Sequence, residues 1–200
     1  MAQSSASAAA IGSSRTNASI RWIASIVAGS ALVAVCAHIS VPLFFTPVPM
    51  TLQPFAVLML GLLLDPAAAF AALALYLVEG AAGLPVFTPQ GPGGMLQLMG
   101  PTGGYLMSYP FVAALVSFVY RAVRGRRFPA GLIAAAAGDI LILACGALWM
   151  AVVLHQHFSA VLSLSVVPFL PGDALKVCAA AGIAAGWLRL RRKDDAVRLS

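Results

Sequence analysis

Long apolar runs, separated by short stretches rich in proline, glycine or charge, form the pattern of this chain. Residues 22–64, 80–120 and 140–172 contain no Asp, Glu, Lys or Arg, and each run is long enough for at least one membrane span of about 20 residues. The breaks at proline, glycine and charged residues divide the chain into six predicted helices. We expect these helices at residues 20–41, 51–64, 67–79, 103–127, 129–155 and 171–193.

The segment 80–101 is not expected to be one helix, because it contains six glycines and four prolines and no formal charge. Irregular backbone cannot face lipid, where unsatisfied amides are costly, so this segment must pack on protein or line a wet cavity. The helices before it, 51–64 and 67–79, are about 20 Å long against a hydrocarbon core of about 30 Å, which leaves a hollow at one membrane face. We expect segment 80–101 to fill that hollow as a lid or binding loop, with a plain surface linker as the alternative.

Composition places the chain in the membrane. Hydrophobic residues make up 61% of it and charged residues 9%, which is too little polar surface to cover a soluble globule of 200 residues. The three cysteines are scattered through apolar segments, so neither a disulfide framework nor a metal site is expected. The predicted fold class is an all-α integral membrane protein.

The basic residues predict the orientation. Eleven of the twelve Lys and Arg residues lie in three clusters, near residues 15–21, 121–127 and 189–198. Six transmembrane helices put all three clusters on one side, which the positive-inside rule assigns to the cytoplasm together with both the N- and C-termini. Topology therefore explains the net charge of +6, and no nucleic-acid partner is expected. We divide the chain into a flexible cytoplasmic N-terminal tail (1–19), a membrane domain (20–190) and a basic cytoplasmic C-terminal tail (191–200).

The twelfth cation, Lys176, lies inside a membrane segment three residues after Asp173. Both side chains share one helix face, and charges at that depth are costly enough to mark a site by default. A salt bridge that only holds the helix to its neighbours is the alternative. A cation and a carboxylate under a glycine-rich loop suit a small amphiphile with an acid group and an amide-like head. Gln53 and Tyr105, near the outer ends of their helices, offer further polar contacts, although Tyr105 could instead be an interfacial anchor.

Asp139 is a second acidic residue near the middle of a predicted span. It lies about ten residues into helix 129–155, or roughly 15 Å from the start of that helix. We expect it to face the bundle interior in a structural hydrogen-bonding role, with a transport role as the alternative.

Four segments carry a resemblance to a known family. They are Val-Pro-Met-Thr-Leu-Gln (48–53), Gly-Ala-Ala-Gly-Leu-Pro-Val-Phe (80–87), Gly-Pro-Thr-Gly-Gly-Tyr-Leu (100–106) and Pro-Phe-Leu-Pro-Gly-Asp-Ala-Leu-Lys (168–176). In this order they resemble the signature segments of BioY proteins, the substrate-binding S components of biotin transporters of the energy-coupling factor (ECF) type. The resemblance implies a multi-pass protein of the bacterial cytoplasmic (inner) membrane, with an ECF S-component-like fold, that captures biotin in an outward-facing pocket. Loops 44–50 and 84–101 would cover that pocket.

The family also implies a site and partners. A transmembrane coupling protein and two ATPase subunits would drive release inward, and the chain itself would need no cofactor. Biotin offers ureido N–H donors, a carbonyl acceptor and a carboxylate tail, and the sequence leaves open which end meets Lys176. The substrate-binding residues implied by the family are Asp173, Lys176, Tyr105, Gln53, Thr102, Gly103 and Phe87.

Three other functions were weighed against this one. A solitary biotin carrier would work without the coupling partners, and an S component for another small vitamin would share the same architecture. An intramembrane enzyme is not expected, because the chain has no Gly-x-Ser-x-Gly or His-Glu-x-x-His motif. A phosphate-binding loop ending in Gly-Lys-Ser/Thr is also absent from the sequence, so ATP hydrolysis would have to come from partner subunits, and we assign no catalytic or metal residue.

Overall fold

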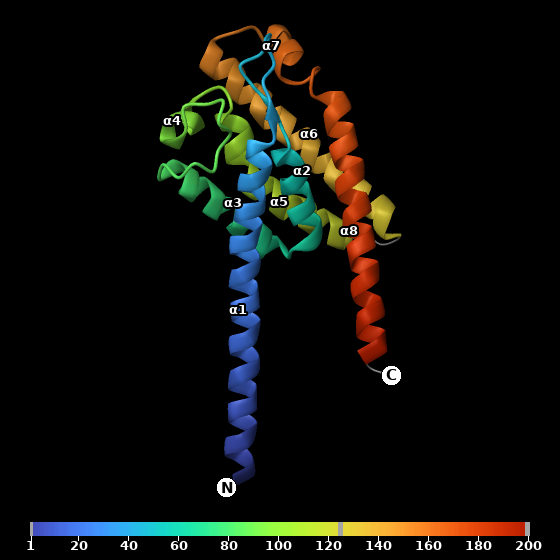
Figure 1. Ribbon diagram of the computed structural model, residues 1–200. Coiled ribbons are helices and arrows are strands. Elements are labelled where there is room, and N and C mark those ends of the chain that lie inside the picture. Colours follow the sequence, from blue (N-terminus) through green and yellow to red (C-terminus); the bar gives the residue numbers. More distant parts are fainter. Residues whose placement is uncertain (1, 124–125, 199–200) are drawn as a thin grey trace.

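In the computed structural model of the chain, residues 2–123 and 126–198 are described, and they form a bundle of helices (Figure 1). The helices that overlap the six predicted ones are α1 (Ala2–His38), α2 (Gln53–Leu63), α3 (Pro66–Ala81), α5 (Gly103–Ala122), α6 (Arg127–Leu154) and α8 (Leu170–Arg198). The connections contain two further short helices and a small sheet: α4 (Gly94–Met99), α7 (Phe158–Ser165), β1 (Ser40–Val41) and β2 (Met50–Thr51).

Helix α1 differs most from its prediction. It begins at Ala2, so residues 2–19, expected as a flexible tail, are helical. The Ala-rich composition of that stretch explains this, since alanine has the highest helix propensity. At its other end α1 stops at His38, and Ser40 and Val41 form β1, which pairs antiparallel with β2. The connection between helices α1 and α2 is therefore a β-hairpin that holds the first turn of α2 close to the end of α1.

The turn between α2 and α3 forms as predicted. The Asp65 carboxylate accepts hydrogen bonds from the backbone N–H groups of Ala67 (3.1 Å) and Ala68 (3.0 Å), and Pro66 is the first residue of α3. Asp65 is thus the N-cap of α3, and the proline after it suits the first position of the helix.

Several helices are long and apolar enough to cross a bilayer. In the described part of the chain these are Asn17–His38 within α1, together with α5 and α6. Segments Ser159–Ser165 and Leu170–Leu190, bent by 52° at the break between them, make a fourth candidate, and α2 and α3 are shorter apolar helices. The protein is therefore a helical multi-pass membrane protein, and a count of six spans stays a prediction.

Helix α2 lies inside the bundle and packs against α1, α5, α6 and α8. Val57 and Leu58 in its middle are fully buried. Gly61 allows α2 and α5 to approach closely, because a Cβ there would lie 2.8 Å from both the Ala113 carbonyl oxygen and the Val116 Cβ. This packing fixes α2 beside α5 and holds its first turn next to the hairpin.

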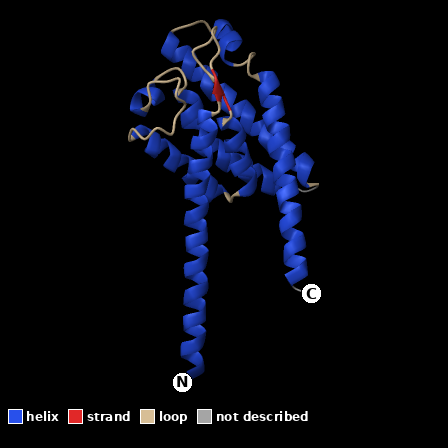
Figure 2. Cartoon of the chain, in the orientation of Figure 1, coloured by secondary structure: helices blue, strands red, loops and turns tan. Residues whose placement is uncertain are grey.

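The connections gather at two ends of the bundle. The hairpin, α4 and α7 lie together at the upper end in Figures 1 and 2, which we call the loop end. The start of α1 and the end of α8 extend beyond the opposite end. We call this the basic end, after Arg121, Arg126, Arg127 and Arg189.

Candidate binding site

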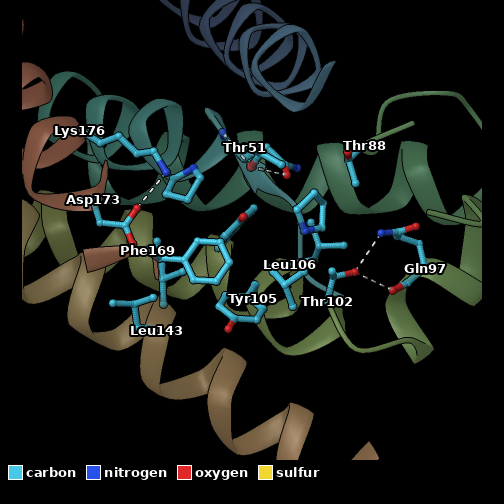
Figure 3. Close-up of a pocket in the computed structure, with 16 residues that line it drawn as sticks. Thr51, Thr88, Gln97, Thr102, Tyr105, Leu106, Leu143, Phe169, Asp173 and Lys176 are labelled. Atoms are coloured by element: carbon cyan, nitrogen blue, oxygen red, sulfur yellow. Dashed lines mark hydrogen bonds and ion pairs between the residues drawn. The ribbon is translucent and has the colours of Figure 1, made fainter. Parts of the chain in front are cut away.

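A narrow cavity lies at the loop end, between α2, α5, α6 and α8 (Figure 3). The volume inside it that the centres of water molecules can occupy is about 40 Å³. Its polar lining residues are Thr51, Gln53, Thr88, Gln97, Thr102, Tyr105, Tyr109, Asp173 and Lys176. Its remaining lining residues are Val48, Pro49, Pro54, Leu106, Ile142, Leu143 and Phe169. The cavity therefore combines apolar surface with convergent polar side chains, as is usual for small-molecule sites.

Asp173 and Lys176 form an ion pair in the wall of this cavity. The Lys176 Nζ lies 2.8 Å from the Asp173 Oδ1, and the two residues are only 9% and 3% exposed. The predicted placement of both residues on one helix face, turned toward a cavity, is confirmed. Within the described chain, Asp173 is the one hydrogen-bond partner of the Lys176 ammonium, which leaves two of its three N–H donors for a ligand.

Gln53, the first residue of α2, is held by a chain of hydrogen bonds that reaches the loops. Its Nε2 donates to the Tyr76 hydroxyl at 2.6 Å, and that hydroxyl donates to the Val86 carbonyl oxygen at 3.1 Å. The Thr51 hydroxyl donates to the Gln53 Oε1 at 3.1 Å. Tyr76, on α3, thus links a polar group of the cavity wall to segment 82–93. Sequence reasoning missed it, although a tyrosine within a short apolar helix signals a buried hydroxyl that needs partners.

Tyr105 is a buried part of the wall and not an interfacial anchor. Its side chain comes from the first turn of α5, is 8% exposed, and donates a hydrogen bond from its hydroxyl to the Ser165 carbonyl oxygen at 2.8 Å. Because Ser165 ends α7, this bond ties α7 to the cavity.

Thr102 precedes α5 and is bonded to the short helix α4. The Gln97 Nε2 donates to the Thr102 hydroxyl at 2.9 Å, and the Gln97 Oε1 accepts from the Gly93 N–H at 3.3 Å. Gln97 was not among the predicted site residues. The sequence did contain an indication of this role, because Gln97 is one of two glutamines in the charge-free segment that was expected to cover a cavity.

The other two predicted residues, Gly103 and Phe87, lie behind the wall. The Phe87 ring packs edge-on against the Tyr76 ring at a centroid distance of 5.4 Å and also covers Gly80. Gly103 is buried where α5 begins and has no room for a side chain, since a Cβ there would overlap the Leu98 carbonyl oxygen. The structure thus brings five of the seven predicted residues together around one cavity and puts these two in support of them.

The segment expected to act as a lid lines the cavity. Thr88 and Gln97 come from it, and Val48 and Pro49 come from the hairpin on the other side. The expectation that this segment lines a cavity is confirmed, and the plain surface linker is excluded. The remaining wall residues missed from the sequence are aliphatic and aromatic side chains of the spans, which no pattern distinguishes from ordinary core.

Asp139 is buried in α6, one turn before the wall residues Ile142 and Leu143. It is 7% exposed, and its Oδ1 has no hydrogen-bond partner in the described part of the chain. The interior position is confirmed, whereas the hydrogen bond expected for a purely structural role is not found at this oxygen. No group of three or more His, Cys, Asp and Glu side chains within residues 2–123 and 126–198 is arranged to hold a metal ion.

Comparison with known proteins identifies the family. The BioY family model matches residues 9–193. The biotin transporter BioY2 of Lactococcus lactis is 34% identical over 76% of this chain and 81% of its own, and the biotin transporter BioY of Thermotoga maritima is 37% identical over 82% and 92%. A crystal structure of the S component for biotin from an ECF-type ABC transporter superposes with a TM-score of 0.80 at 26% identity, over 88% of this chain and 93% of that one. The chain belongs to the BioY family.

Proposed function

We propose that this protein is a biotin transporter, the S component that captures biotin at the loop end and delivers it inward across the bacterial cytoplasmic membrane. The observation that carries the proposal is the buried pair of Asp173 and Lys176 in the wall of an apolar cavity. The family and the biotin-specific relatives support the same substrate. Transport, and not catalysis, is the activity.

The chemistry of the wall matches that of biotin. The carboxylate of Asp173 can accept hydrogen bonds from ureido N–H groups, and the free donors of Lys176 can bind either the ureido carbonyl or the carboxylate tail. Phe169 and Leu106 supply apolar surface for the rings and the aliphatic chain. We assign contacts with biotin to Asp173, Lys176, Tyr105, Gln53 and Thr102, and we assign Gly103 and Phe87 the role of holding the wall.

The cavity must widen to admit biotin, because its present volume holds only a few water molecules. Segments 44–50 and 84–101 lie outside the long helices and can therefore move without breaking the packing of those helices. Biotin would enter beneath them and be enclosed when they return.

In the proposed topology the loop end faces outward and the basic end faces the cytoplasm. The start of α1 and the end of α8 lie at the basic end, which agrees with six spans and cytoplasmic termini. A transmembrane coupling protein and two ATPase subunits would energise release. A solitary carrier is the alternative, and biotin uptake that persists in cells lacking these subunits would favour it.

The first test is calorimetric titration of the detergent-purified protein with biotin. Biotin is expected to bind tightly, and biotin amide more weakly, because amidation removes the carboxylate that a cation can pair with. Riboflavin is the control and is expected not to bind. Binding of riboflavin, or a folded protein that ignores biotin, would contradict the assignment and point to another vitamin.

Tyr76→Phe is expected to lower biotin affinity about five- to thirtyfold, since it removes two hydrogen bonds worth about 1 kcal/mol each and frees Gln53. The ring and its packing on Phe87 remain, so the fold should persist. Biotin titration and the melting temperature Tm measure the two effects separately. Tyr120→Phe, which removes a hydroxyl outside the cavity wall, is the matched control. Equal affinities in Tyr76→Phe and wild type would exclude the positioning role.

A further inference from the structure

A second cavity lies at the basic end, remote from the biotin site. It has a volume of about 260 Å³ and lies between the end of α5, the start of α6 and the lower part of α8. Its lining residues are Tyr120, Val123, Arg127, Ala130 and Leu188. Three of these five side chains are aliphatic, so the cavity combines one cation and one phenol with an apolar wall.

Arg127 is the unusual member of this wall. Its Nη1 is buried, yet it has no hydrogen-bond partner in the described part of the chain. A guanidinium is always charged and carries five N–H donors, and burying one of its nitrogens without a partner is costly. The position of Arg127 in a cavity wall suggests that its partner is an anion from outside the chain.

The surroundings of the cavity also favour an anion. Arg126 and Arg189 are exposed at the same end. The Asp65 carboxylate, in the turn between α2 and α3, is occupied in capping α3. Positive charge therefore dominates among the described side chains at this end.

We propose that this cavity binds the phosphate of an anionic phospholipid, with the Arg127 guanidinium as its charge partner and the Tyr120 hydroxyl as a second donor. Basic pockets between membrane helices at the cytoplasmic side are suited to such headgroups. Ile133, one helical turn after the wall residue Ala130 on α6, is 56% exposed and extends the apolar surface beside the cavity. An acyl chain attached to the bound phosphate can lie along that surface, whereas a free phosphate ion would leave it uncovered.

The test compares phosphatidylglycerol with phosphatidylcholine of the same acyl chains, added to delipidated protein in detergent. Phosphatidylglycerol is expected to raise the Tm of the wild type by more than phosphatidylcholine does, and to stay bound in native mass spectra. Arg127→Gln should weaken this lipid-specific binding about tenfold or more, since a charge-assisted hydrogen bond is lost. Arg189→Gln removes the same charge from an exposed position at the same end and should retain the effect.

Biotin binding, which involves none of these residues, checks that each variant is folded. If Arg127→Gln does not fold, Arg127→Lys can be used instead. It keeps the charge but lacks the planar guanidinium with its paired N–H donors, so it should bind the lipid more weakly than wild type. Equal lipid binding by wild type and the folded Arg127 variant would overturn the proposal. So would inorganic phosphate reproducing the whole stabilisation, because the site would then be one for a free anion.

Discussion

Asp173→Asn and Lys176→Ala are each expected to lower biotin affinity by about ten- to a hundredfold. Each removes one hydrogen bond to a charged partner, worth on the order of 1.5 to 3 kcal/mol. Each also leaves the other member of the pair buried and unpaired, which costs about 3 to 5 kcal/mol of folding stability. A lower biotin affinity in a single variant could therefore reflect either the lost contact or the weakened fold. Calorimetry on the single variants must be combined with an experiment that separates these two effects.

The double variant Asp173→Leu with Lys176→Met separates the two effects. Replacing a buried ion pair by apolar residues of similar volume is often neutral or stabilising, so the double variant should insert and keep the Tm of the wild type. Its biotin affinity should nevertheless fall by about 10²- to 10⁴-fold, because both polar contacts are gone. If it bound biotin with the affinity of the wild type, the pair would be a structural salt bridge alone and the site assignment would be wrong.

Ser30→Ala supplies a matched control away from the cavity. The Ser30 hydroxyl donates to the Glu79 carboxylate and joins α1 to α3, and neither residue lines the biotin cavity. Removing this polar contact should lower Tm while biotin affinity stays near that of the wild type. A parallel loss of affinity would mean that any weakening of the bundle abolishes binding, and the single variants at the ion pair would then carry no information about contacts.

The ion pair could be predicted from sequence because local spacing and the cost of buried charge were sufficient. Asp173 and Lys176 lie three residues apart on one helix, so helical geometry alone puts them on one face. The break in the helices between residues 80 and 101 could be predicted for a similar reason, since glycines and prolines exclude a long helix there. Neither inference needed to know which helices are neighbours.

Contacts between distant segments could not be predicted in this way. Tyr76 meets Gln53 across 23 residues, and Tyr105 meets Ser165 across 60. These bonds depend on how α2, α3, α5 and α7 pack, which no local pattern encodes. The six-residue helix α4 was missed because it lies among glycines and prolines that argue against helix. Its place depends on bonds such as that from the Trp149 Nε1 to the Gly100 carbonyl oxygen at 2.9 Å.

Gly103→Ala is expected to lower both Tm and biotin affinity, although Gly103 does not line the cavity. A Cβ at this position would overlap the Leu98 carbonyl oxygen and lie 2.9 Å from the Trp149 Nε1. The first obstacle is backbone and cannot rotate away, and the second is held by its hydrogen bond to Gly100. The turn between α4 and α5 would have to shift, at a cost of about 1 to 3 kcal/mol for overpacking. Thr102, which lies in that turn, would move out of the wall with it.

Gly186→Ala distinguishes this steric effect from a general response to alanine. A Cβ at Gly186 would meet nothing within 4 Å, and the residue lies inside α8, where alanine stabilises a helix by about 0.5 to 1 kcal/mol relative to glycine. Its Tm should rise or stay level and its biotin affinity should not change. Similar losses in both variants would contradict the account. A stable Gly103→Ala protein with the biotin affinity of the wild type would also contradict the account. It would show that the close packing of the α4–α5 turn is not what holds Thr102 in the cavity wall.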